Sequence, residues 1–585
     1  MSISGPFIVR PIATTLVWLA VVLAGWLAHS LLSVAPLPQI EFPAVSVSAS
    51  LPGASPEVMA SSVAMPLERS LGAIAGVTEM TSRNSVGSTR ITIQFDLSRN
   101  IDSAAKDVQA AINAARALLP SGLRSNPTYK KVNPAAAPIL TLALTSDSLS
   151  QGQLYDVATT IVQQKLAQVP GVGEVVIGGS SMPAVRIDLD PNALSQYGVS
   201  LDTVRAAIAA SNTMRPKGML ENDSHTWQVM ANDQLIRAAE YRPLIVAWRN
   251  GAPVRLADVA KVEDSVEDVH TLGYFNDHPA ILVLVRSQAS SNIIKTVDQI
   301  RADLPTLRAM LPADVNVDVA QDRTPSIRAS VFEAEKTLVI AIGLVMLVVL
   351  VFLRNWRAAL IPTVAVPVSL VGTFGVMYLA NFSLNAMSLM GLIIATGFVV
   401  DDAIVVLENI IRHIERGESP KRAALRGTKE VGFTVMSMSI SLIAVFIPIL
   451  LMGGLPGRLF REFAVTLASA ILISMFVSLT LTPMMASRLL RQRPPDHGAV
   501  AAASPNMSAR ALEAIMRAYA RSLDWSLRHG RIMLLLLLAT VCLNVYLYRI
   551  VPKGLFPQQD TGRLQGQIMA DQDTSSGTMK RMMTE

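Results

Sequence analysis

The sequence predicts an α+β membrane protein, in which a bundle of seven transmembrane helices carries a large region of small α+β subdomains outside the cytoplasm. Three observations lead to this fold class. The chain of 585 residues is 51% hydrophobic and only 16% charged, whereas a soluble protein carries about a quarter charged residues. Seven apolar stretches are long enough, or nearly so, to cross about 30 Å of hydrocarbon. Between the first two of them, residues 33–335 show alternating strand and helix patterns.

The apolar stretches are the first elements to place. A membrane helix needs about 20 mainly apolar residues. The candidate spans are 11–32, 337–353, 359–380, 386–410, 431–453, 463–486 and 532–549. The first span is long and runs on through Ser30–Ala35 without a convincing cleavage site, so we interpret it as a retained anchor rather than a signal peptide.

The charges predict how the spans are oriented. The formal net charge is +6, and most of the Lys and Arg residues near the spans lie in the short segments expected on the cytoplasmic side. No nucleic-acid-binding motif accompanies them. The segment 380–385 has no charge, which places it outside, together with residues 33–335. Arg458 and Arg461 are the exception, because they fall in the predicted outer loop between the fifth and sixth spans.

Residues 33–335 contain half-buried strands and amphipathic helices. Apolar residues alternate with period two in 44–51, 89–96 and 139–145, the pattern of a strand with one buried face. Helix patterns occur near 55–72, 102–118, 151–168 and 291–309. The first helix begins at Ser55, a capping hydroxyl that is followed by Pro56 and Glu57.

Similar sequence segments, called echoes here, recur along the chain and indicate that parts of it are duplicated. The turn-and-strand segment 75–80 follows one helix as 170–175 follows another, so we predict two α+β subdomains. A block at 182–269 interrupts the second; it contains a helix at 201–211 and a polar arm at 212–233. A further echo relates 37–41 to 556–560, each followed by a strand-like segment. The chain therefore resembles one full repeat plus the opening of a second, a common plan for transporters.

Residues 508–529 predict an amphipathic helix between the sixth and seventh spans. Six apolar residues share one face, with arginines as the complement. This pattern favours a helix that lies on the cytoplasmic membrane surface. The alternative is a loop helix packed on the bundle. The single cysteine, Cys542, lies in the seventh span, which excludes a disulfide framework and a cysteine-based metal site within the chain.

Two adjacent acids, Asp401 and Asp402, lie near the middle of the fourth span. Insertion scales put a central Asp at about +2.5 to +3.5 kcal/mol, so the pair must face a bundle interior or be partly protonated. Two neighbouring carboxyls in a low dielectric are expected to titrate as a coupled unit that holds one proton near neutral pH. Such a pair can couple a proton gradient to a change of shape. We therefore predict a proton relay at Asp401 and Asp402.

The sequence gives weaker evidence of a function for the other polar residues in or near the spans. The structural alternative for the acid pair is hydrogen bonding to Ser388 or Thr396. Glu408 and Asn409, two turns on, are either part of a proton path or interfacial residues that reach water. Apart from Arg549, the last residue of the seventh span, no Lys or Arg lies inside the other six spans, so we expect the basic partner of the acids outside these 585 residues. The seven histidines are scattered and are interpreted as ordinary polar residues; they are His29, His225, His270, His278, His413, His497 and His529.

At this point the sequence resembles the resistance–nodulation–division (RND) efflux transporters of the hydrophobe/amphiphile class. The resemblance covers the whole chain, and the acid pair in this setting is a highly specific motif. The segments that carry it are Phe7-Ile8-Val9-Arg10-Pro11, Leu37-Pro38-Gln39, Leu51-Pro52-Gly53-Ala54, Pro170-Gly171-Val172-Gly173 and Asp401-Asp402-Ala403-Ile404-Val405-Val406 with Glu408-Asn409.

The resemblance implies a subunit of a tripartite multidrug efflux pump in the inner membrane. Such a subunit is not an enzyme, needs no cofactor or metal and is driven by a proton gradient. Its implied partners are the membrane, a paralogous subunit in a mixed trimer, a periplasmic adaptor protein, an outer-membrane channel and amphiphilic small molecules. Family members are about twice this length. Gly178 and Gly179 stand where an aromatic pocket residue would be expected, so no substrate-binding residue is assigned.

The resemblance also implies ferredoxin-like periplasmic subdomains and a domain plan. The expected units are 1–32 (N-terminus and first span), 33–135 (first porter subdomain), 136–181 with 270–335 (second porter subdomain), 182–269 (docking subdomain with its arm), 336–490 (spans two to six), 491–531 (cytoplasmic loop with the interfacial helix), 532–550 (seventh span) and 551–585 (truncated start of a second periplasmic repeat).

Three other functions compete with this one. A truncated, non-transporting partner subunit would have the same residues. A heavy-metal exporter of the same superfamily typically keeps one acid where this chain has Asp401 and Asp402. An intramembrane aspartyl protease needs two acids that face each other from separate helices, whereas neighbours on one helix point about 100° apart.

Overall fold

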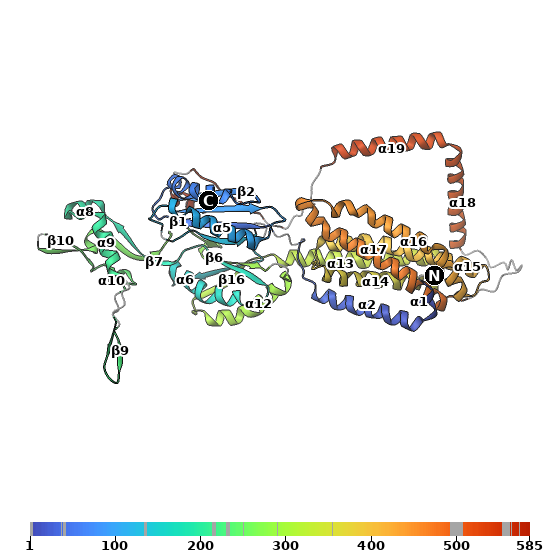
Figure 1. Ribbon diagram of the computed structural model, residues 1–585, viewed down its shortest axis with the longest axis horizontal. Helices are drawn as coiled ribbons and strands as arrows, with labels where there is room; N and C mark the ends of the chain where they lie inside the picture. The colour runs from blue at the N-terminus through green and yellow to red at the C-terminus, as the bar shows by residue number, and fades with distance from the viewer. Residues whose placement is uncertain are drawn as a thin grey trace.

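The structure is a computed structural model of the chain. It describes residues 4–36, 38, 42–123, 125–133, 137–212, 218–229, 234–249, 251–288, 291–353, 355–491, 507–552, 562, 564–571 and 574–584. The two halves of the echo between 37–41 and 556–560 lie almost entirely outside these residues. Figure 1 shows an elongated molecule, with a helical bundle at one end and mixed helix–strand subdomains at the other.

The first soluble subdomain is a four-stranded antiparallel sheet covered by helices. Its strands lie in the order β2-β3-β1-β4. Val45, Val47, Ile91 and Ile93 alternate on the buried face and pack against the helices, as the period-two pattern predicted. The elements are β1 (Ala44–Ser50), α3 (Pro56–Val58), a π-helical segment (Met59–Ala64), α4 (Met65–Gly72), β2 (Val77–Ser85), β3 (Ser88–Phe95), α5 (Ile101–Ala115), a 3-10 turn (Arg116–Leu118) and β4 (Thr128–Val132).

The second subdomain repeats this topology. Its sheet order, β16-β5-β15-β6, places the strands as in the first, with the fourth strand of the unit beside the first. Leu142, Leu144, Val283 and Val285 form the centre of its core. The elements are β5 (Leu140–Ser146), α6 (Gln151–Val157), a π-helical segment (Ala158–Gln163), α7 (Gln164–Ala167), β6 (Val172–Gly178), β15 (Ile281–Ser287), α12 (Ile293–Met310) and β16 (Val315–Asp322). A short hairpin of β13 (Tyr274–Phe275) and β14 (His278–Pro279) precedes β15.

The duplication extends to detail that the sequence pattern did not predict. The first helix of each subdomain contains a six-residue π-helical segment, at Met59–Ala64 and at Ala158–Gln163. Each helix begins with a serine cap. Ser55 Oγ accepts a hydrogen bond from the amide of Val58 at 3.4 Å, and Ser150 forms a capping box with Gln153. The repeated unit therefore includes the helix irregularity as well as the strand order.

A block is inserted between β6 and β15. Its ends, β7 (Pro183–Leu189) and β12 (Ala260–Val266), pair antiparallel and hold the block at the far end of the molecule from the helical bundle (Figure 1). It also contains α8 (Pro191–Tyr197), α9 (Leu201–Ser211), α10 (Ala238–Tyr241), β10 (Ile245–Arg249), β11 (Ala252–Arg255) and α11 (Leu256–Val259). The predicted arm is described only in part, as a projecting hairpin of β8 (Met219–Glu221) and β9 (Thr226–Gln228).

Seven helices in the described part of the chain are long and apolar enough to cross a membrane. They are α2 (Pro11–Leu31), α13 (Thr324–Leu353), α14 (Trp356–Leu379), α15 (Ala386–Glu415), α16 (Pro420–Leu450), α17 (Gly454–Leu489) and α19 (Gly530–Ile550); a short α1 (Gly5–Val9) precedes α2. Several extend beyond the apolar stretch that predicted them, because a helix can continue into water where its side chains become polar. In this way α13 is continuous from the second subdomain into the bundle (Figure 1).

The placement of Arg458 and Arg461 in a loop was wrong. The turn after α16 is short and α17 already begins at Gly454, so both arginines are helical. The guanidinium of Arg458 donates a hydrogen bond to the carbonyl oxygen of Leu97 in the first soluble subdomain. For Arg458, the apparent breach of the charge pattern therefore coincides with a contact between the bundle and the soluble region.

The C-terminal part lies apart from the bundle. The amphipathic helix α18 (Met507–Arg528) runs across the direction of α19 (Figure 1). Its described side chains, from Ala514 onward, are exposed apart from the partly buried Ser526, so in this structure these side chains are not packed on the described part of the bundle. Residues 564–571 form no strand, contrary to the prediction. A strand needs a hydrogen-bonded neighbour, and no described segment pairs with this one. The chain then forms α20 (Ser576–Thr584).

Candidate functional site

The site lies on α15, which runs through the middle of the bundle. The helix begins at Asn385, whose side chain accepts hydrogen bonds from the amides of Met387 and Ser388. It packs against α13, α14, α16 and α17. Its 30 residues span about 45 Å at 1.5 Å per residue. Asp401 and Asp402 fall near the centre of that length, far from either end of the helix.

The bundle separates the two acids. Asp402 is 6% exposed, and its Oδ2 accepts hydrogen bonds from Ser474 Oγ on α17 at 3.2 Å and from Ser439 Oγ on α16 at 3.4 Å. Asp401 lies on the exposed face of α15. Within the described residues, neither carboxylate forms a salt bridge. Among the described side chains, those that bond the buried acid are neutral hydroxyls from two other helices.

Each of these hydroxyls has a second acceptor. Ser474 Oγ also lies 3.2 Å from the carbonyl oxygen of Val399, and Ser439 Oγ lies 3.0 Å from that of Val435. A serine carries one hydroxyl proton, so it can donate fully to only one partner at a time. A negative charge on Asp402 favours donation to the carboxylate, because hydrogen bonds to ionised groups are the stronger ones.

The alternative role of the acid pair, hydrogen bonding to Ser388 or Thr396, named the wrong partners. Ser388 Oγ donates to backbone carbonyls at the start of α15, and Thr396 Oγ1 donates to carbonyls of its own helix. The real partners, Ser439 and Ser474, could not be selected from the sequence, because that choice depends on how three helices are rotated about their axes. The only signal was the presence of hydroxyls in otherwise apolar spans.

Glu408 and Asn409 differ in solvent exposure, as Asp401 and Asp402 do. Glu408 is exposed, whereas Asn409 is 7% exposed. The Asn409 amide donates to the carbonyl oxygen of Gly427 at 2.8 Å and to Glu430 Oε2 at 3.3 Å. Asn409 therefore connects α15 to α16 and is not a residue that reaches water at the interface.

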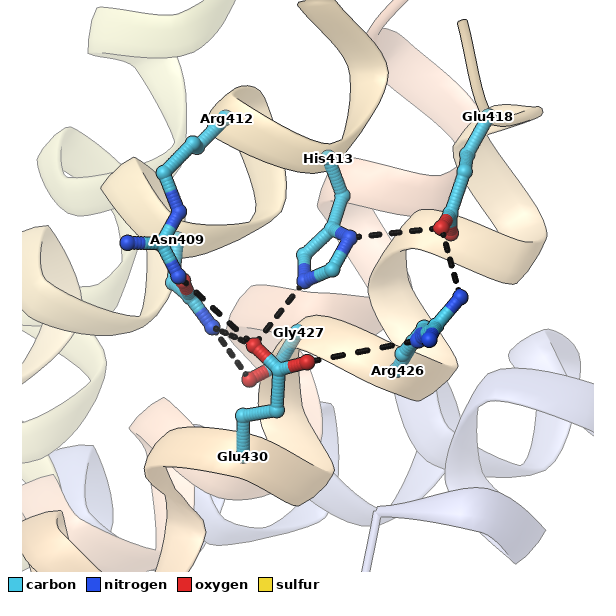
Figure 2. A network of polar contacts seen from close by, with 7 residues as sticks. All are labelled: Asn409, Arg412, His413, Glu418, Arg426, Gly427 and Glu430. Carbon is cyan, nitrogen blue, oxygen red and sulfur yellow. Dashed lines mark hydrogen bonds and ion pairs between the residues drawn. The ribbon is translucent and has the colours of Figure 1, made fainter. Parts of the chain in front are cut away.

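His413, which was expected to be an ordinary polar residue, is not isolated but lies in a network of charged side chains. Figure 2 shows its ring between Glu418 and Glu430, with Arg426 bridging the two acids. The ring is 3% exposed. A signal was available in the sequence, because His413 follows Asp402 by eleven residues, which is close to three full turns of an α-helix. The imidazole ring is thus buried on the same face of α15 as the buried acid.

Comparison with known proteins assigns the family. A model of the AcrB/AcrD/AcrF family matches residues 3–585. The chain belongs to this family. Its members are RND transporters, so the expected resemblance is confirmed.

Similar proteins include several that are named "Multidrug resistance protein MdtC". The chain is 59% identical to those of Yersinia pestis bv. Antiqua (strain Angola) over 579 residues and Serratia proteamaculans (strain 568) over 574 residues. The matches cover 99% and 98% of this chain, but 56% of each relative. The chain therefore spans little more than half the length of these curated relatives. Family membership and the seven long apolar helices indicate a multipass membrane protein.

Proposed function

We propose that this chain forms part of the inner-membrane subunit of a tripartite multidrug efflux pump, which exports amphiphilic compounds by proton antiport. The observation that carries the proposal is the carboxylate of Asp402, buried at mid-span and bonded by Ser439 and Ser474. Intramembrane acids are rare and commonly belong to proton relays. The family and the printed names of its relatives supply the multidrug class.

The geometry supports a route from protonation to movement. An ionised Asp402 attracts both serine hydroxyls and so ties α15 to α16 and α17. A protonated Asp402 is a weaker acceptor, which leaves Ser439 and Ser474 to donate to the carbonyls of Val435 and Val399. Proton occupancy thereby changes the contacts among three helices. Two elements can carry that change to the soluble region: α17 through the bond from Arg458 to Leu97, and the continuous helix α13.

The wider arrangement follows from the same proposal. The two βαββαβ subdomains are porter subdomains of ferredoxin-like topology on the periplasmic side, and the inserted block is the docking subdomain. The helix α18 lies on the cytoplasmic membrane surface. The partners are an MdtB-like paralogue in a mixed trimer with this MdtC-like chain, a periplasmic adaptor and an outer-membrane channel. The acids Asp401 and Asp402 form the proton relay, with Asn409 along its path and Glu408 beside it.

A flux experiment tests proton antiport. Inside-out membrane vesicles that contain the complete pump are energised so that their lumen is acidic, and a fluorescent amphiphile is added. We expect uptake of the amphiphile together with alkalinisation of the lumen, because each transported molecule must be exchanged for protons.

The control adds a protonophore before the amphiphile, which should abolish uptake. Uptake that continues at an unchanged rate without a proton gradient would contradict the proposal.

A further inference from the structure

His413 lies on the same face of α15 as Asp402. Eleven residues at about 100° each return to within about 20° of the same direction and advance about 16 Å along the axis. The advance is toward the end of the bundle that is distant from the soluble subdomains (Figure 1), which is the cytoplasmic end in the proposed orientation. Asn409 lies between the two on the same buried face.

Both nitrogens of the His413 ring face carboxylate oxygens. Nε2 donates to Glu430 Oε2 at 3.0 Å, and Nδ1 lies 3.4 Å from Glu418 Oε1. Nδ1 is buried and has no aligned hydrogen-bond partner among the described residues. A neutral imidazole has one N–H, so one of its nitrogens would turn a lone pair toward a carboxylate. An imidazolium has two N–H donors and satisfies both sides.

The charged groups around the ring balance one another and are in contact with water. Arg426 lies 3.0 Å from Glu418 and 4.0 Å from Glu430, and Arg412 lies 3.6 Å from Glu430 (Figure 2). In the part of the chain that the structure describes, these two acids and two arginines are the charged groups that surround the ring. The side chains of Glu418 and Glu430 are 24% and 43% exposed. The buried ring therefore has direct neighbours that reach solvent.

Buried hydroxyls occur on α16 and α17, the two helices that hold Asp402 and pack against α15. Ser478 and Thr482 follow Ser474 by one and two turns along α17, and Thr428 lies on α16 one residue after Gly427, which bonds Asn409. Their side-chain oxygens are buried and have no hydrogen-bond partner among the described residues. Buried polar groups are nearly always bonded to protein or water. Hydroxyl groups that are free to donate and accept hydrogen bonds are what a proton-carrying chain of hydroxyls and water requires.

We infer that His413 is the proton acceptor on the cytoplasmic side of Asp402, a role that rests on the proposed antiport function. The proton leaves the Asp402 carboxyl, which becomes a carboxylate, and passes along the hydroxyls and intervening water. It then binds the lone pair of Nδ1 on the neutral ring. The resulting imidazolium is paired with Glu418 and Glu430 and afterwards releases the proton to cytoplasmic water, which restores the neutral ring. Only O–H and N–H bonds are made and broken.

Two substitutions separate proton transfer from mere ion pairing. His413→Gln can still donate to Glu430 but cannot take up a proton, and His413→Arg supplies a permanent cation that cannot release one. Amphiphile-driven proton flux is measured in inside-out vesicles of the complete pump, with the cytoplasmic pH varied from about 5.5 to 8 around the usual imidazole range. Lys421→Gln, at an exposed position on the first turn of α16, is the matched control.

We expect wild-type flux and Lys421→Gln flux to depend on cytoplasmic pH across this range. Both His413 variants should lose that dependence and be about tenfold slower or more at neutral pH, with normal assembly in size-exclusion chromatography. A wild-type pH profile in either assembled His413 variant would overturn the inference. Asp402→Asn is assayed in parallel: if it keeps its coupled flux, the proposed function fails, whereas failure confined to His413 leaves that function intact.

Discussion

Replacing Asp402 by asparagine is expected to reduce drug resistance to the level of cells that lack the pump. The asparagine side chain has nearly the same shape, and its carbonyl oxygen can accept from Ser439 and Ser474 as the carboxylate does. It cannot gain or lose a proton in the physiological range. Because a neutral side chain is also less costly at mid-span than an acid, the variant should insert, express and assemble normally. Growth on amphiphilic drugs and quantitative immunoblotting measure the two properties separately.

Two further variants make this result specific. Asp401→Asn changes the acid on the exposed face of α15, and we expect a smaller loss because that acid is not held by the serines. Glu333→Gln changes an exposed acid that pairs with Lys336 one turn along α13 and should leave resistance unchanged. Full resistance in Asp402→Asn cells with wild-type amounts of protein would refute the relay at this position.

The spans and the acid pair could be predicted from the sequence because their signals are local. About 20 apolar residues define a membrane helix wherever the neighbours lie, and an acid in such a segment is conspicuous. The partners of Asp402 could not be predicted, since contact between α15, α16 and α17 depends on the rotation and crossing of whole helices. The surroundings of His413 could not be predicted for the same reason, because Glu418 and Glu430 reach it only through the turn between α15 and α16.

The soluble subdomains show the same division. Period-two patterns predicted β1, β3 and β5, but the sheet orders, in which strands distant along the chain become neighbours, follow from tertiary packing. Residues 564–571 mark the limit of a local pattern. Their sequence resembles a strand, yet no described segment pairs its backbone with theirs. Residues 564–571 therefore form no strand in this structure.

Replacing Gly171 by alanine is expected to cause a large loss of stability in the second subdomain. Gly171 has a φ of +91°, a region that L-residues adopt at a cost of about 1–2 kcal/mol. A Cβ atom there would also overlap Oγ1 of Thr296, which is 3% exposed, and would lie 3.3 Å from Cβ of Ser291. Overpacking of this kind adds about 1–3 kcal/mol. Hydrogen exchange of the β6 and β15 amides in the purified protein should report a local loss of about 2–5 kcal/mol.

The duplicated fold supplies the control for this prediction. Gly76 occupies the equivalent turn of the first subdomain with a φ of +81°, but a Cβ atom there meets only the flexible side chain of Arg99, whose Cδ would be 3.5 Å away. Gly76→Ala should therefore show the backbone cost alone, about 1–2 kcal/mol. Removing the hydroxyl with Thr296→Ala should recover part of the Gly171→Ala loss, because residues in contact are not additive. Equal losses for the two glycines would show that the backbone conformation, and not the contact with Thr296, explains why glycine is needed at this turn.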